Sequence, residues 1–235
     1  VLYLADTKRI PFGDKNIDQI RSISVEICNW FINKNLDALL IACNTTNACA
    51  LDILEKNLEI PCFDLINSVA EIVTKKNIGV LGTSTTIKTS YYKNVIEFRS
   101  ENIKVFQQEC PEFVPEIETT QINFNQINYL SDLYLNSLLK ENIEEIILGC
   151  SHYPLIYDFF KKKVHPKIRI IDPSVALVNE FNKTFLIPKD ACSERISYDN
   201  VKFFVTAKSE EFSKKVKYWL GINKEISLVN LRSDD

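Results

Sequence analysis

The sequence lacks methionine, has only two histidines and five glycines, and contains no hydrophobic run long enough to cross a membrane. A spanning helix needs about 20 predominantly apolar residues, and no basic segment followed by an apolar core opens the chain. Lysine and arginine do not cluster, and the net charge is −3. Capture of nucleic acid or of an anionic membrane therefore has no electrostatic basis. We expect a cytoplasmic protein with neither kind of partner.

The seven cysteines include no Cys-x-x-Cys pair. An odd number of cysteines, scattered through a chain that is long enough to bury a core, is not typical of a disulfide framework, and the spacing of a zinc site is missing. A content of 46% hydrophobic and 25% charged residues is typical of a globular protein. The missing methionine and the apolar start at Val1–Ala5 lead us to expect that the sequence is part of a longer product.

Short apolar runs alternate with longer segments of helical period, which is the pattern of βα units around a mostly parallel sheet. The expected strands are 1–5, 38–42, 78–81, 103–106, 145–148, 168–171 and 201–205. The expected helices are 17–31, 48–58, 89–99, 126–140, 174–185 and 212–220. The sequence thus predicts an α/β fold.

One pattern occurs twice: an apolar strand that ends in cysteine followed by small polar residues, at 39–46 and again at 146–154. This repetition predicts two similar α/β lobes, each of which contributes one strand end to a shared cleft. Open α/β sheets bind ligands at the carboxyl ends of their strands. We assign residues 1–66 and 177–235 to the first lobe, which carries Cys43, and residues 67–176 to the second, which carries Cys150.

Cys43 and Cys150 are the main candidates for chemistry. A thiol between a strand and a helix start lies near unpaired N–H groups and the helix dipole, which favour its thiolate form. The alternative is a buried cysteine that acts as a small hydrophobe. Cys28, Cys49, Cys62, Cys110 and Cys192 lack this context, and we interpret them as structural or incidental.

His152 follows Cys150 by two residues and is a candidate for proton transfer or for binding a carboxylate, unless it only satisfies a helix start. A Cys/His pair also suits nucleophilic hydrolysis, but that reaction needs a single thiol. Two similar strand-end cysteines suit a reaction with two faces, in which one side of a carbon loses a proton and the other side gains one. Racemisation is such a reaction. His165 is expected to be a surface or capping residue.

The segment Gly82–Thr86 also follows an expected strand. Backbone N–H groups at a helix start, together with several hydroxyls, can hold a carboxylate or a phosphate. A helix cap with surface threonines explains the same residues. The lysine and spacing of a Walker loop and the Gly-x-Gly-x-x-Gly pattern are both missing, so nucleotide binding has little support.

Several motifs together resemble the glutamate racemases of the aspartate/glutamate racemase superfamily. They are Asp6–Gly13, Ala42–Thr45, Gly82–Thr86, Cys110–Glu118 and Leu148–Pro154, in the family's order over nearly the whole chain. The resemblance implies interconversion of L- and D-glutamate without pyridoxal phosphate, another cofactor or a metal. It also implies a homodimer whose product supplies peptidoglycan synthesis.

The resemblance further implies roles for individual residues. Cys43 and Cys150 would be the two catalytic acid/bases, and His152 and Glu118 would assist Cys150. The residues lining the glutamate site would be Phe12, Gly13, Asn44, Thr45 and Ser151, with hydroxyls from Thr83 and Thr86.

This sequence departs from the family pattern in three places. Phe12 replaces a usual tyrosine, and Ser151 replaces a usual threonine. The family's N-terminal strand and glycine-rich turn, with an aspartate and a serine of the site, has no counterpart. Two alternatives therefore stay open: a racemase of aspartate or of a related amino acid, and an inactive ligand-binding member of the family.

Overall fold

The computed structural model describes residues 1–119, 121–187 and 197–231. The chain divides into two compact units, one made of residues 1–10 and 186–235 and the other of residues 11–185. The strands of the described residues form three sheets, and every strand pair in them is parallel. The predicted α/β fold with mostly parallel sheets is confirmed.

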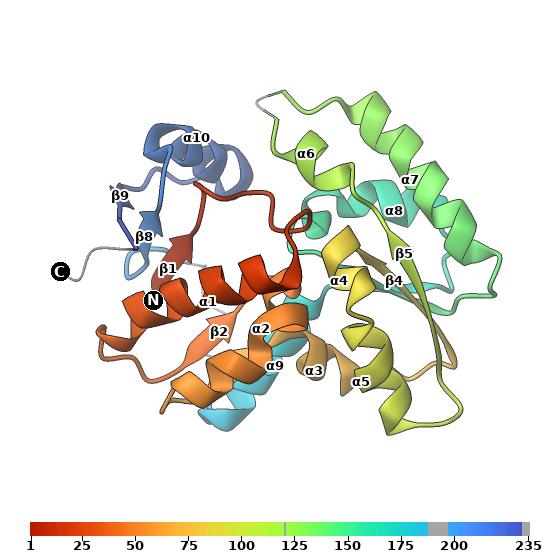
Figure 1. Cartoon of the computed structure of the whole chain (residues 1–235). Coiled ribbons are helices and arrows are strands. Elements are labelled where there is room, and N and C mark those ends of the chain that lie inside the picture. The colour runs from red at the N-terminus through yellow and green to blue at the C-terminus, as the bar shows by residue number, and fades with distance from the viewer. Residues whose placement is uncertain (120, 188–196, 232–235) are drawn as a thin grey trace. The chain divides into compact units, whose positions relative to one another are not determined.

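The larger unit contains a four-stranded sheet in the order β5-β4-β6-β7, of which Figure 1 labels β4 and β5. Its strands are β4 (Asn77–Gly82), β5 (Lys104–Glu109), β6 (Glu145–Gly149) and β7 (Arg169–Ile171). Gly82 of β4 lies opposite Gly149 of β6. The strand ends are therefore level, and the residues that follow them, Thr83 and Cys150, leave the sheet at the same edge.

Successive side chains of a strand point to opposite faces of a sheet, and in this sheet the side chains on both faces are buried. Ile146 and Leu148 of β6 pack into a cluster with α6 (Phe113–Ile117), α7 (Phe124–Leu139) and α8 (Tyr157–Lys163). Ile147, between them, packs into a second cluster with α3 (Leu65–Ala70), α5 (Tyr91–Arg99) and α9 (Pro173–Thr184). Helices on both faces fix the strand ends on which the candidate site is built.

A two-stranded sheet pairs β2 (Leu39–Ile41) with β3 (Cys62–Asp64). Ile41 lies in a cluster with Cys28 of α1 (Ile17–Ile32) and Leu51 of α2 (Asn44–Asn57). Phe63 of β3 packs instead on Leu177 of α9. This sheet too carries helices on both faces, and its β2 end leads directly into Cys43.

The smaller unit has a parallel sheet in the order β1-β8-β9, formed by β1 (Leu2–Ala5), β8 (Lys202–Val205) and β9 (Ile226–Leu228). Helix α10 (Ser209–Leu220) follows β8. The ring of Tyr3 lies against Phe203 and Phe212, with centroids 5.5 and 6.1 Å away. The three aromatic rings tie the strand at the start of the chain to the C-terminal segment within this unit.

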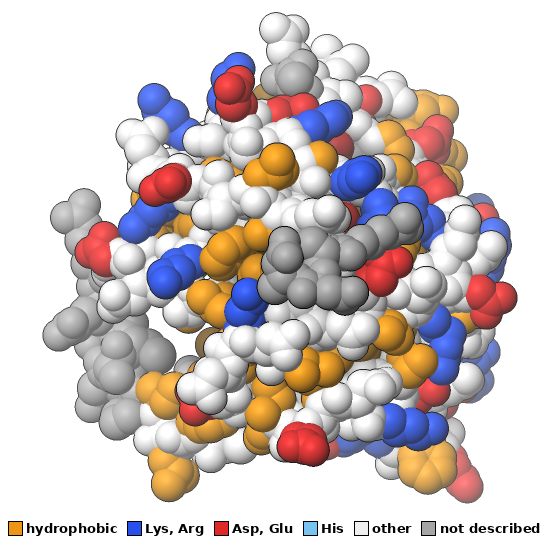
Figure 2. Space-filling model, turned by 60° about the vertical axis from the view of Figure 1, so that its left-hand side comes forward, with side chains coloured by type: hydrophobic (Ala, Val, Ile, Leu, Met, Phe, Trp, Pro, Cys, Tyr) orange, Lys and Arg blue, Asp and Glu red, His pale blue; other side chains and the backbone are white. Residues whose placement is uncertain are grey.

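All seven expected strands and all six expected helices are present, with bounds shifted by a few residues. The sequence analysis missed the short elements β3, β9, α3, α6, α8, α4 (Ser84–Lys88) and the 3₁₀ turn η1 (Tyr153–Ile156). None of the helices in the described ranges is long and apolar enough to cross a membrane. Figure 2 shows acidic and basic side chains scattered over the face in view, with hydrophobic side chains between them.

Candidate active site at the strand ends

Cys43 lies at the junction between β2 and α2, as predicted. It is the N-cap residue of α2 in an extended conformation, its side chain makes no capping hydrogen bond, and its carbonyl accepts the first helical hydrogen bond from Asn47 at 3.0 Å. The thiol is half-buried. The side chain therefore lies beside the unpaired N–H groups of a helix start, which attract negatively charged groups.

Asn47 fixes the backbone around Cys43, and sequence reasoning missed it. Its amide nitrogen donates to the carbonyls of Ile41 at 2.9 Å and of Cys43 at 3.0 Å. Its amide oxygen accepts the backbone N–H of Leu65 at the start of α3. The side chain is 1% exposed. One buried amide therefore ties the end of β2 to the start of α3 and sets the direction in which Cys43 leaves the strand.

Three threonine hydroxyls form a buried triangle between α2 and α4. Thr45 Oγ1 lies 3.1 Å from the hydroxyl oxygens of both Thr83 and Thr86, which are 2.9 Å from each other. Thr83 is the N-cap of α4 and accepts the N–H of Thr86. The Gly82–Thr86 segment thus caps a helix, but its threonines are buried and not on the surface as the capping alternative expected. Its hydroxyls gather beside the residues that follow Cys43, and their role in holding a carboxylate stays a prediction.

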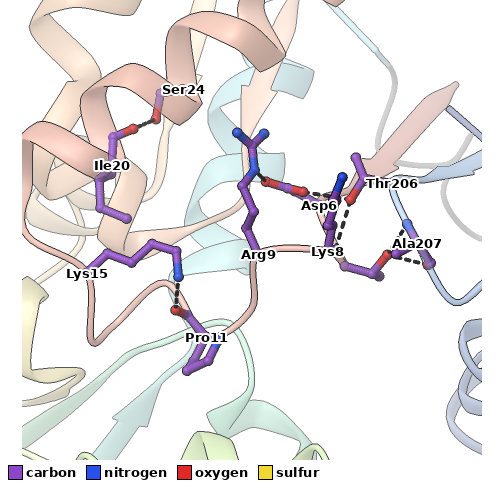
Figure 3. Close-up of polar contacts among 10 residues, drawn as sticks. Asp6, Lys8, Arg9, Pro11, Lys15, Ile20, Ser24, Thr206 and Ala207 are labelled. Carbon is purple, nitrogen blue, oxygen red and sulfur yellow. Dashed lines mark hydrogen bonds and ion pairs between the residues drawn. The ribbon is translucent and has the colours of Figure 1, made fainter. Parts of the chain in front are cut away.

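The turn that contains Gly13 packs against this triangle. A Cβ added to Gly13 would lie 2.5 Å from Thr83 Cβ, and the Thr85 hydroxyl donates to the carbonyls of Gly13 at 2.8 Å and Lys15 at 2.7 Å. Figure 3 shows the Lys15 ammonium turned back onto the carbonyl of Pro11, 3.0 Å away. Phe12 is half-buried in the same turn. Of the predicted site residues, Gly13, Thr45, Thr83 and Thr86 are therefore brought together.

The start of the Asp6–Gly13 motif belongs to the smaller unit. Asp6 accepts hydrogen bonds from Arg9 Nε and from the Thr206 hydroxyl, the latter at 2.6 Å (Figure 3). The Thr7 hydroxyl and Ala207 exchange hydrogen bonds with each other. These contacts pin the segment after β1 to the segment after β8.

Cys150 follows β6 and faces a line of two titratable side chains. Its sulfur lies 3.8 Å from His152 Nδ1, and His152 Nε2 lies 2.6 Å from Glu118 Oε1. Burial lowers the pKa of His152, but hydrogen bonds with the Cys150 sulfur and the Glu118 carboxylate raise it more, and the net pKa is raised to about 10. His152 is thus cationic at neutral pH, held between two groups that can carry negative charge.

The environment expected for Cys150 was wrong in one respect. No α-helix begins at this cysteine: the next element is the four-residue turn η1, which starts at Tyr153. The local positive charge comes from the side chain of His152 and not from a helix dipole. Ser151 is exposed, and His165 is a surface residue whose Nδ1 accepts the N–H of Lys167.

The other described cysteines are buried or half-buried. Contrary to the expectation, Cys110 does not lack the strand-end context, because it directly follows β5. Burial raises the pKa of Cys28 in α1, raises that of Cys49 in α2 to about 11, and raises that of Cys62 in β3 to about 12. Burial also raises the pKa of the Cys110 thiol. These thiols stay protonated and unreactive at neutral pH. Cys192 lies outside the described residues.

Tyr92, at the start of α5, is a further residue that sequence reasoning missed. It is fully buried, and its hydroxyl donates to the side-chain oxygen of Asn44 at 2.6 Å. Its ring edge lies 3.3 Å from the position that a Cβ on Gly149 would occupy. A single side chain therefore hydrogen-bonds to the residue after Cys43 and lies beside the residue before Cys150.

The site thus combines two strand-end thiols, one of them beside a histidine–carboxylate pair, with a set of hydroxyl and amide groups. No group of three or more His, Cys, Asp or Glu side chains that could hold a metal occurs within residues 1–119, 121–187 and 197–231. Such a set can move protons and can hold a carboxylate by hydrogen bonds. It fits proton transfer at a carbon acid.

Comparison with known proteins identifies the class. Residues 3–181 match the Asp/Glu/Hydantoin racemase family, and the chain belongs to that family. It is 44% identical over 233 residues to the glutamate racemase of Prochlorococcus marinus strain NATL2A, covering 98% of this chain and 87% of that protein. The family resemblance found in the sequence is therefore confirmed.

Solved structures agree with this assignment. The crystal structure of glutamate racemase isoform RacE1 from Bacillus anthracis superposes with a TM-score of 0.87 at 28% identity and covers 98% of this chain and 87% of that one. Glutamate racemase from Francisella tularensis, solved in complex with D-glutamate, gives 0.87 at 27% identity and covers 98% and 88%. The fold and the enzyme class are thus those of amino-acid racemases.

Proposed function

We propose that this protein interconverts L- and D-glutamate without a cofactor, with Cys43 and Cys150 as the two acid/bases. The observation that carries the proposal is that both cysteines directly follow parallel strands, each beside groups suited to charge. The 44% identical relative is named a glutamate racemase, and a relative solved with D-glutamate has the same fold. Both support glutamate as the substrate.

In the proposed reaction, the thiolate of one cysteine takes the α-proton of glutamate, so that a Cα–H bond breaks and an S–H bond forms. The thiol of the other cysteine gives its proton to the opposite face of the planar carbanion, where a new Cα–H bond forms. The two cysteines thereby exchange protonation states. The reverse direction uses them in the opposite roles.

The remaining residues hold the substrate and stabilise charge. The carbanion is stabilised when hydrogen-bond donors face the carboxylate onto which its charge spreads. The groups that we assign to holding the substrate are Asn44, Thr45, Thr83, Thr86, Ser151 and the turn with Phe12 and Gly13. His152 lies between the Cys150 sulfur and the Glu118 carboxylate, and we assign both side chains to assisting Cys150.

Substitution of each cysteine tests the proposal. Cys43→Ser and Cys150→Ser are expected to abolish racemisation, because a serine hydroxyl is too weak an acid to exchange the α-proton at neutral pH. Each variant should retain slow exchange of the α-proton in heavy water for only one enantiomer, measured by proton NMR. Cys28→Ala, which changes a buried cysteine of α1, is the control and should keep racemisation. Normal turnover in either serine variant would refute the two-base assignment.

The same assay decides the substrate. Racemisation should be followed by circular dichroism with glutamate and with aspartate in parallel. A preference for aspartate would replace the glutamate assignment by the related amino-acid racemase, and binding without turnover of either would leave a ligand-binding protein.

We further propose that the protein is a cytoplasmic homodimer and that it supplies D-glutamate for peptidoglycan. Its two lobes are proposed to be residues 1–66 with 177–235, and residues 67–176. Sedimentation equilibrium gives the mass of the assembly directly. A monomer at micromolar concentration would contradict the dimer. Rescue of a D-glutamate auxotroph by the gene would support the role in the cell wall.

A further inference from the structure

The amide of Asn44 has one end engaged and the other end open. Its oxygen accepts the Tyr92 hydroxyl at 2.6 Å. Its nitrogen has no hydrogen-bond partner among the described residues. Among the described residues, Gln107 Oε1 is the only side-chain nitrogen or oxygen that is both buried from solvent and without a hydrogen-bond partner. The Asn44 nitrogen therefore reaches solvent, although the residue is only 3% exposed.

The Tyr92 hydroxyl determines which end of the amide is open. If the amide were turned over, its NH₂ would donate to the phenol oxygen and the phenol proton would lose its acceptor. Tyr92 is fully buried, and Asn44 is the hydrogen-bond partner of its hydroxyl. A buried donor without a partner costs about 1–3 kcal/mol, which holds the amide in one orientation. Burial also raises the pKa of Tyr92, so its hydroxyl remains a donor.

The ring of Tyr92 is fixed as firmly as its hydroxyl. It belongs to the cluster that includes Ile66, Val80 and Ile147, and its edge lies against Gly149, directly before Cys150. Tyr92 therefore fixes the position of the open NH₂ group of Asn44 relative to the segments that carry Cys43 and Cys150. Two N–H donors at one nitrogen suit a carboxylate oxygen.

We propose that Tyr92 is a positioning residue for substrate binding: its hydroxyl holds the Asn44 amide with the NH₂ group toward a carboxylate of the substrate. This inference rests on the proposed function, since the carboxylate is taken to be that of glutamate. Tyr92 does not contact the substrate and acts only through Asn44.

A double-mutant cycle tests the proposal. Tyr92→Phe keeps every carbon of the ring and removes only the hydroxyl, so Asn44 can turn over and present its oxygen to the carboxylate. The KM for glutamate should rise about three- to tenfold, the worth of one buried hydrogen bond, with kcat changed by less than about twofold. In an Asn44→Ala background, the same Tyr92→Phe change should alter KM by less than about 1.5-fold.

Tyr134→Phe is the matched control. Tyr134 is also buried, and its hydroxyl donates to the Glu112 carboxylate. It should lower the melting temperature without raising KM. An unchanged KM in Tyr92→Phe, or equal effects of Tyr92→Phe in both backgrounds, would overturn the proposal.

The cycle also separates the two hypotheses. A wild-type protein that does not racemise glutamate sinks the proposed function. In that case the double-mutant cycle is measured with the dissociation constant of glutamate, obtained by calorimetry. The role of Tyr92 is refuted if its effect is not coupled to Asn44 or if glutamate does not bind.

Discussion

Replacing Glu118 by glutamine should weaken the activity of Cys150 by a predictable amount. The carboxylate lies 2.6 Å from His152 Nε2 and helps to raise the pKa of that histidine to about 10. A hydrogen bond to a charged group contributes about 1.5–3 kcal/mol. Removing the charge should lower the pKa of His152 by about 1 to 2 and lower kcat/KM about 10- to 150-fold.

Two further features of this variant are fixed by thermodynamics. The enantiomers of glutamate have equal free energy, so kcat/KM must fall by the same factor in both directions, while kcat and KM individually can differ. The histidine's raised pKa contributes stability that is fully present below pH 6.5 and is lost as the pH rises through about 10. The difference in melting temperature between wild type and variant should therefore be largest near pH 6 and shrink toward pH 10.

The assay is racemisation followed by circular dichroism from both enantiomers between pH 6 and 10. Glu116→Gln, two residues away on α6, is the control, since Glu116 accepts the backbone N–H of Asn123 and not His152. If Glu118→Gln keeps the wild-type rate and the wild-type alkaline limb of the pH profile, the Cys150–His152–Glu118 line has no part in proton transfer.

The remaining predictions concern the scaffold of the site. Gly13→Ala places a carbon 2.5 Å from Thr83 Cβ and should raise KM at least tenfold. The control Gly221→Ala has open space around it but a φ of +70°, so it should cost about 1 kcal/mol of stability and leave KM unchanged. Equal KM values for the two variants would contradict this prediction. Asn47→Ala leaves the N–H of Leu65 and the carbonyl of Ile41 without their partner and should lower the free energy of unfolding by about 2–5 kcal/mol in urea titration, against less than about 0.5 kcal/mol for Asn57→Ala at an exposed helix position. A small loss at Asn47 would show that water replaces its hydrogen bonds.

The sequence predicted the long elements because they carry a period. The helix at 17–31 and the strand at 145–148 are found within a residue of their bounds. The strand β3 has only three residues after Pro61, and α4 and α6 have five each. Elements of that length complete barely one turn or one alternation, so no period marks them.

The residues of the candidate site were likewise predicted only in part from the sequence. Cys43, Thr83 and Cys150 were predicted because each directly follows an apolar run. Asn47 and Tyr92 were missed because their roles depend on partners 18 and 48 residues away in the sequence. Such contacts exist only after the strands and helices have packed, and residue type and spacing do not reveal them.

Gly149 occupies a position where no side chain fits unless the backbone moves. A methyl group there would lie 2.7 Å from the backbone carbonyl oxygen of Leu81 and 3.3 Å from the ring of Tyr92. A crowded side chain can be trimmed by a second mutation, but a carbonyl oxygen has no smaller substitute. No single compensating exchange can therefore make room, and mutants at this codon have to shift two neighbouring strands at once.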